Sequence, residues 1–103
     1  MRTIYYSVEI AQRARLENDN IIAYLAREHT MAVADYLLAF KEQIDRLHWL
    51  PARFPKIRER LQNRRTYRHV LLFKRYRIVY RIQQRKVIIL RVMHQAQLLT
   101  EVE

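Results

Sequence analysis

The fold is decided by the stretch YRHVLLFKRYRIVYRIQQRKVIILRVMHQ, which covers residues 67–95. Three segments of it, residues 67–74, 76–82 and 86–94, are rich in β-branched and aromatic residues, and only short polar turns separate them. Such segments are typical of strands joined by hairpins. The stretch therefore predicts a three-stranded antiparallel meander. Its turns contain neither glycine nor asparagine, which leaves the turn types open.

Alternation along these strands divides the side chains between two faces of a sheet. Arg77, Arg81 and Arg91 fall opposite the apolar positions, so we expect a basic face that serves binding more than folding. The alternative is that arginine stems cover apolar sheet surface while their charged ends stay in water. The apolar face is predicted to comprise Val70, Leu72, Ile78, Tyr80, Ile82, Ile88, Leu90 and Val92.

Before this stretch, the sequence predicts a short strand and a first helix. Residues 3–8 have the composition of a strand. Residues 14–29 carry apolar side chains at helical spacing, which indicates one buried helix face. The residues on this face are Ala14, Ile21, Ile22 and Leu25.

A second helix is predicted to begin after Thr30, which is a suitable N-cap, and to end before Pro51 and Pro55. Its apolar stripe repeats by four and three, so this face should pack against the sheet or the first helix. The stripe consists of Val33, Leu37, Phe40, Ile44 and Leu47. The full order predicts one α+β domain over residues 1–103, in which a single sheet packs on a two-helix hairpin.

Charge is distributed unevenly along the chain. The 103 residues include 20 Lys and Arg against 10 Asp and Glu, a formal net charge of +10 at pH 7, although half of the residues are hydrophobic. Residues 51–91 hold fourteen of the bases and a single acid, Glu59. A globular domain this basic is expected to bind an acidic partner.

Missing residue types exclude several classes of site. The chain has no glycine, which phosphate-binding loops, dinucleotide-binding loops and nucleophile elbows require. It has no cysteine, and His29, His48, His69 and His94 are far apart, so we expect no metal and no cofactor. No apolar run approaches the roughly 20 residues that span a bilayer, and we expect a cytoplasmic protein.

Four motifs in this order give the chain a family resemblance: LHWLPARFP after the second helix, TYRHV and YRIVYRI in the meander, and VIILRVMH at its end. They resemble the RelE/ParE superfamily of toxins from bacterial toxin–antitoxin modules, and most of all the ParE-type toxins. The resemblance implies a toxin that inhibits DNA gyrase and is neutralised by a cognate antitoxin with an acidic C-terminal segment. It also implies the strand, helix hairpin and meander described above.

Two alternatives remain open at this point. RelE-type relatives share the fold but cut messenger RNA in the ribosome, so a ribosome-dependent endoribonuclease is the main alternative. A basic nucleic-acid-binding domain is a minor one, because the second helix carries Asp35, Glu42 and Asp45 and makes a poor recognition helix.

The chain departs from the family pattern in two places. His94 is followed by Gln95, Ala96 and Gln97, where the family commonly has glycine and then arginines, so any contribution of that basic pair to toxicity is in doubt. Asn18 stands where an apolar helix residue is expected, which concerns packing alone.

Candidate site residues lie in the meander. In an endoribonuclease, His94 would transfer a proton, Tyr80 would assist, and Arg81 and Arg68 would hold the phosphate. The meander offers no carboxylate to orient His94, which could equally be a strand-end histidine bonded to backbone, so no catalytic residue is assigned. For binding phosphate or the target, the candidates are Arg68, Arg77, Arg81 and Arg91.

Overall fold

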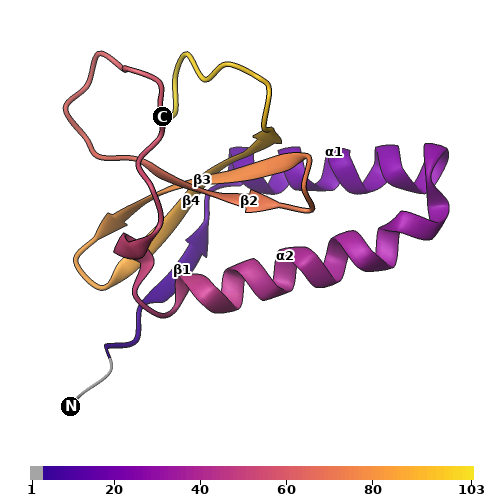
Figure 1. Ribbon diagram of the computed structural model, residues 1–103, viewed down its shortest axis with the longest axis horizontal. Coiled ribbons are helices and arrows are strands. Elements are labelled where there is room, and N and C mark those ends of the chain that lie inside the picture. The colour runs from indigo at the N-terminus through magenta and orange to yellow at the C-terminus, as the bar shows by residue number, and fades with distance from the viewer. Residues whose placement is uncertain (1–3) are drawn as a thin grey trace.

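The computed structural model describes residues 4–103. Two long helices and a four-stranded sheet form the body of the molecule (Figure 1). The predicted fold class and order of elements are confirmed. In chain order the elements are β1 (Ser7–Ile10), α1 (Gln12–Glu28), the 3-10 helix η1 (Thr30–Ala32), α2 (Val33–Leu47), the 3-10 helix η2 (Pro51–Arg53), β2 (Arg68–Leu72), β3 (Tyr76–Gln83) and β4 (Lys86–His94).

The sheet has the strand order β1-β4-β3-β2. β2, β3 and β4 form the predicted antiparallel meander, whereas β1 pairs parallel to β4 and makes the sheet mixed. The opening strand starts later than predicted, at Ser7, because the preceding backbone pairs with the end of α2: the Tyr6 amide donates to the His48 carbonyl. Thr3 lies outside the described residues.

The helices and one face of the sheet enclose the first core. Ala14 and Leu25 of α1 are buried there, and Ile21 and Ile22 pack against them, as predicted. On α2, the predicted stripe residues other than Leu37 also contact this core.

Leu37 is exposed, and Tyr36 is the residue of α2 that is fully buried in its place. A buried hydroxyl needs a hydrogen-bond partner. The Tyr36 hydroxyl donates to Asn18 Oδ1 on α1 at 2.6 Å. Asn18, which departs from the apolar pattern of the sequence, therefore ties the two helices together.

The junction between the helices differs from the prediction. Thr30 begins η1, and its hydroxyl donates backward to the Ala26 carbonyl at 3.0 Å instead of accepting a bond from α2. No side chain caps α2 at its start. The threonine hydroxyl therefore stabilises the end of α1, not the start of α2.

A β-bulge overturns part of the predicted core. The register pairs Val79 with Arg91 but Tyr80 with Ile89, so Leu90 is an extra residue in β4. An extra residue reverses the alternation on one side of it. Val92 faces the helices as predicted, but Ile88 and Leu90 do not, and Val87 and Ile89 take their places in the first core.

The second face of the sheet is covered, so the prediction of an open basic face is wrong. The loop before β2 and the C-terminal tail come together on the side of the sheet away from α2 (Figure 1). With side chains from β3 and β4 they bury a second apolar cluster. Its buried members are Tyr67, Val79, Leu90, Met93, Leu99 and Val102.

Tight connections adopt left-handed backbone without the help of glycine. Phe73 and Lys74 lie in the β2–β3 turn with φ of 51° and 63°, and Gln84 lies in the β3–β4 turn with φ of 56°. Leu50, which precedes η2, has φ of 49°. Left-handed backbone is unfavourable for residues that carry a Cβ atom. These four positions therefore carry local strain that the surrounding contacts hold in place.

Candidate functional site

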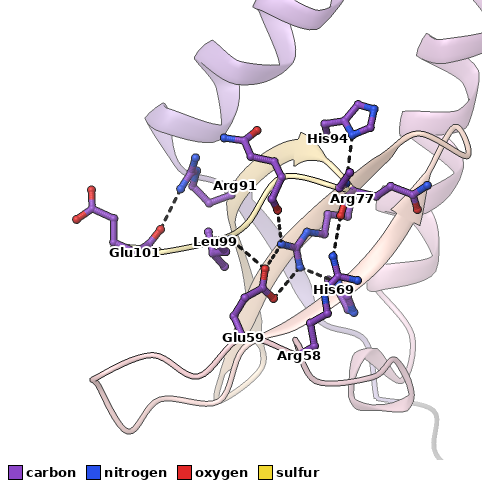
Figure 2. Close-up of polar contacts among 11 residues, drawn as sticks. Arg58, Glu59, His69, Arg77, Arg91, His94, Leu99 and Glu101 are labelled. Atoms are coloured by element: carbon purple, nitrogen blue, oxygen red, sulfur yellow. Dashed lines mark hydrogen bonds and ion pairs between the residues drawn. The ribbon is translucent and has the colours of Figure 1, made fainter.

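Arg77 lies at the centre of a buried polar network beneath the second face (Figure 2). Its guanidinium forms a two-pronged ion pair with Glu59, and the two side chains are only 3% and 4% exposed. A further bond of 3.1 Å runs from Arg77 Nη2 to the Gln97 carbonyl, and the Leu99 amide donates to Glu59 at 3.0 Å. The pair thus joins the loop, the sheet and the C-terminal tail.

The charges of this network alter two pKa values. Burial alone would raise the pKa of Glu59, but hydrogen bonds from Arg77 and from the Leu99 amide outweigh burial and lower that pKa to about 2. The ring of His69 lies 3.2 Å from Arg77 Nη1. Burial and then the positive charge of Arg77 lower the pKa of His69. The network therefore holds an ionised Glu59 and favours a neutral His69.

Arg91 forms a second buried ion pair, which joins the sheet to α1. Its guanidinium donates to both carboxylate oxygens of Glu17 at 2.9 to 3.1 Å, and Glu17 also accepts the Val92 amide at 3.0 Å. Arg91 Nη1 donates to the Glu101 carbonyl of the tail at 2.9 Å. A guanidinium so fully bonded holds α1, β4 and the tail in one arrangement.

Arg81 and Arg68 also bond to other segments, although both are partly exposed. Arg81 Nε contacts Glu103 at 3.2 Å, and Arg65 and the Tyr67 hydroxyl bond to the same carboxylate. Arg68 Nη1 donates to the Phe54 carbonyl at 2.7 Å. All four predicted arginines therefore bind this chain itself, and the expected exposure of Arg77 and Arg91 is wrong. Whether any of the four touches a target stays a prediction.

The residues of the endoribonuclease alternative are not gathered at one point. The Tyr80 hydroxyl is buried in the first core and donates to the Pro51 carbonyl at 2.6 Å, and burial raises its pKa. Arg68 pairs with Tyr80 across the sheet, but Arg81 contacts Glu103 by way of the second face. His94 is exposed at the end of β4, where its Nδ1 accepts the Ala96 amide at 3.1 Å.

The unpaired positive charge lies mainly on loops and turns, a position that alternation along the strands does not indicate. Glu59, the single acid within residues 51–91, forms its ion pair with Arg77. Most of the other bases in this range are exposed. A charge count by segment contained this signal, since the stretch before β2 is the most arginine-rich part of the chain. The exposed bases between residues 51 and 91 are Arg53, Lys56, Arg58, Arg60, Arg64, Arg65, Lys74, Arg75 and Arg85.

A groove of about 1070 Å³ follows the outer edge of β2, between the helices and the segment after η2. Its lining is apolar at Leu71, Phe73 and Tyr76 and basic at residues that include Arg58 and Lys74. No Asp or Glu is among the described residues that line it. The groove, which we call the β2 groove, can therefore accept an amphipathic segment with acidic side chains.

Part of the edge of β2 is already paired. The His69 amide donates to the Pro55 carbonyl at 3.1 Å, and the Leu71 carbonyl accepts from Gln43 Nε2 of α2 at 2.7 Å. Gln43 Oε1 is buried with no hydrogen-bond partner among the described residues. Buried amide oxygens are usually bonded, so this enclosed acceptor is an exception among the described residues.

Other kinds of site find little support in the described residues. No group of three or more His, Asp or Glu side chains within residues 4–103 could hold a metal ion. None of the helices described here has the length and apolar character needed to cross a membrane.

Comparisons with known proteins agree with this fold. Residues 8–99 match the family model described as ParE toxin of type II toxin-antitoxin system, parDE. The structure is similar to a chain of the chromosomal ParDE TA system from P. aeruginosa, with a TM-score of 0.70 and 14% identity over 87% of this chain and 96% of that chain. At this identity the likeness concerns the fold. A comparison with curated proteins found no match.

Proposed function

The chain belongs to the ParE toxin family of type II toxin–antitoxin systems, and from this membership we propose that it inhibits DNA gyrase and is neutralised by an acidic antitoxin segment in the β2 groove. The family supplies the toxin class and the existence of a cognate antitoxin. The groove is the observation that supports the mode of neutralisation.

Charge and shape favour an antitoxin segment in this groove. The groove is apolar along β2 and flanked by exposed bases, so a segment that alternates apolar and acidic residues would satisfy both features. Such a segment is disordered before it binds, and it folds against the toxin.

Co-expression tests this part of the proposal. An antitoxin from the neighbouring reading frame should restore growth and co-purify with the toxin, and removal of its acidic segment should abolish both effects. Purification of the toxin alone in quantity from healthy cells, without a growth penalty, would contradict the toxin assignment.

For gyrase inhibition, the supporting observation is the exposed basic surface of the loop before β2. This surface can lie against DNA phosphates held in a topoisomerase complex. Arg68 and Arg81, which are partly exposed, are proposed to add to these contacts at its inner margin. Arg77 and Arg91 are proposed to act through the fold, by holding the loop and the tail in place.

A purified system separates gyrase inhibition from messenger RNA cleavage. We expect the toxin to stabilise gyrase-cleaved DNA or to block supercoiling, and induced cells to show a DNA-damage response before translation falls. His94→Ala should retain substantial activity, because inhibition requires no proton transfer and His94 is exposed at a strand end. Ribosome-dependent cleavage that is lost in His94→Ala, with gyrase unaffected at saturating toxin, would favour the endoribonuclease instead.

A further inference from the structure

An exposed apolar surface lies at the end of the molecule where the N-terminal segment meets the end of α2. It consists of Ile4, Tyr5, Trp49 and Leu50, which are 45%, 55%, 42% and 62% exposed, and we call it the Trp49 patch. Tyr5 and Trp49 form an antiparallel bridge, and their rings meet edge to face at 5.0 Å. The two short segments therefore present one continuous apolar surface.

The patch is held rigidly. The Tyr5 ring stacks on His48 at 4.6 Å, and the Tyr6 amide and carbonyl both bond to His48, at 2.9 and 2.7 Å. Leu50 adopts left-handed backbone, which is unfavourable for leucine and directs its side chain into solvent. Strained backbone clusters at functional sites, and an exposed apolar patch that contains such a residue is a candidate binding surface.

Three arginines lie close to the patch along the chain or through backbone pairing. Arg46 precedes Trp49 by three residues, Arg53 follows Leu50 by three, and the Arg85 carbonyl accepts the Ser7 amide next to Tyr6. All three arginines are exposed, and none is in an ion pair within residues 4–103. Two acids of the neighbouring segments pair with other bases, Asp45 with Lys41 and Glu9 with Lys86. A partner surface that fits must therefore carry carboxylates around an apolar recess.

The composition of the patch favours a protein over a nucleic acid. Tryptophan, tyrosine and arginine dominate the residues that contribute most to protein–protein binding. Bases of a nucleic acid stack on free aromatic faces, but Tyr5 already stacks on His48, and the most exposed member of the patch is the aliphatic Leu50. A second copy of this chain would bring like charges together. The patch also lies outside the lining of the β2 groove, with Arg46 of its rim the only residue named here that both share.

We propose that the Trp49 patch docks the toxin onto its protein target, at an apolar recess edged by carboxylates, while the antitoxin occupies the separate β2 groove. The inference rests on the proposed toxin function and names the surface that would engage gyrase. Leu50 is the central anchor of this contact, and Arg46, Arg53 and Arg85 steer the approach of the acidic surface.

Leu50→Asn is the sharpest test, because asparagine tolerates left-handed backbone and removes the apolar side chain. We expect the thermal midpoint to stay equal or rise, antitoxin binding to stay unchanged, and affinity for purified gyrase subunits to fall by about tenfold or more. The matched control is Leu16→Gln, since Leu16 is 57% exposed on α1, outside both the patch and the groove. This control should bind gyrase within about twofold of the wild type.

Growth arrest on induction tests the same surface without assuming the target. Leu50→Asn should be far less toxic than Leu16→Gln at equal expression, and Trp49→Ala should follow Leu50→Asn. If neither gyrase subunit binds the wild type while Leu50→Asn still loses toxicity, gyrase is the wrong target and the docking surface stands. Full toxicity of folded Leu50→Asn, or a loss of antitoxin or DNA binding in place of target binding, would overturn the inference.

Discussion

At the residue scale, burial separates an arginine enclosed by the fold from one at its margin. Arg77 shares its charge with Glu59 in an almost fully buried pair, whereas Arg81 and Glu103 meet at the edge of the second face. Removing one partner of a buried pair leaves an uncompensated charge, which costs far more than the loss of an exposed pair. The two arginines lie on the same strand, so they form a matched comparison.

We expect Arg77→Ala to lower the free energy of unfolding by about 3 to 5 kcal/mol, because Glu59 would remain buried without its partner. Arg81→Ala should cost no more than about 1 kcal/mol. Urea unfolding followed by circular dichroism measures both. Removal of both partners, in Arg77→Met with Glu59→Leu, should recover much of the loss. Equal costs for Arg77→Ala and Arg81→Ala would show that burial does not distinguish them.

The same pair contributes to the acid stability of the protein. The pKa of Glu59 falls from 4.5 to about 2 on folding. Its ionised form therefore stabilises the fold above pH 4.5, and this contribution, on the order of 3 kcal/mol, is lost as the pH falls toward 2. His69 acts in the same direction at higher pH, because its lowered pKa favours the neutral ring.

Unfolding free energies measured from pH 7 to 2 should therefore fall steeply below about pH 4.5 in the wild type. Glu59→Gln should be less stable at pH 7 and should show a shallower decline between pH 4.5 and 2. Asp45→Asn is a suitable control, since Asp45 is exposed in its pair with Lys41. A decline of the same steepness in wild type and Glu59→Gln would contradict the assignment.

At the element scale, periodicity predicted the buried faces of regular helices and strands. It did not predict the effect of an extra residue in a strand or of a segment that folds back over the sheet. The apolar face of α1 was read correctly because Ala14, Ile21, Ile22 and Leu25 follow the helical repeat. Leu37 was wrongly predicted to be buried, because Tyr36 takes that position and bonds its hydroxyl to Asn18 of the other helix. The apolar pattern of a single helix does not contain this contact. The bulge at Leu90 reverses the alternation of side chains in the first part of β4, and no residue type in this strand indicates a bulge.

The prediction of an open basic face was wrong for a related reason. Alternation placed Arg77 opposite the first core correctly, but it does not show that a loop and a tail return to cover that face. The covering acids come from residues 17, 59 and 103, far from the arginines in the chain. The β2 groove was also missed, since it forms between segments that are distant in sequence.

Replacing a residue with positive φ in a turn by glycine should increase stability. Lys74 is exposed and has φ of 63°, a conformation that glycine adopts without a steric penalty. Lys74→Gly should raise the free energy of unfolding by about 0.5 to 1 kcal/mol, after the entropy that glycine adds to the unfolded chain. Thermal unfolding measures the shift, and Lys56→Gly, at an exposed position whose φ is not positive, should lower stability or leave it unchanged.

At the scale of the whole molecule, two separate surfaces are proposed to serve two different partners. The antitoxin segment would occupy the β2 groove along one edge of the sheet, and the target would meet the Trp49 patch at the end of α2. A toxin whose two surfaces are separate can be neutralised either by direct competition or by the bulk of the bound antitoxin. Variants that alter one surface alone show whether that surface serves antitoxin binding or target binding.

Charge reversal at the rim of the β2 groove supplies the complementary variant. Lys74→Glu with Arg75→Glu places carboxylates where the groove is basic, and both residues are exposed at a hairpin tip, so the fold should persist. Affinity for the antitoxin should fall by about tenfold or more at low salt, mainly through slower association, and the difference should shrink near 1 M salt as the charges are screened. Toxicity without antitoxin should stay at the wild-type level, while co-expressed antitoxin should no longer restore growth fully. Leu50→Asn is expected to have the opposite effect, since it should lose toxicity and keep its affinity for the antitoxin. If the Lys74→Glu, Arg75→Glu variant loses toxicity while its antitoxin binding is intact, the β2 groove would bind the target and not the antitoxin.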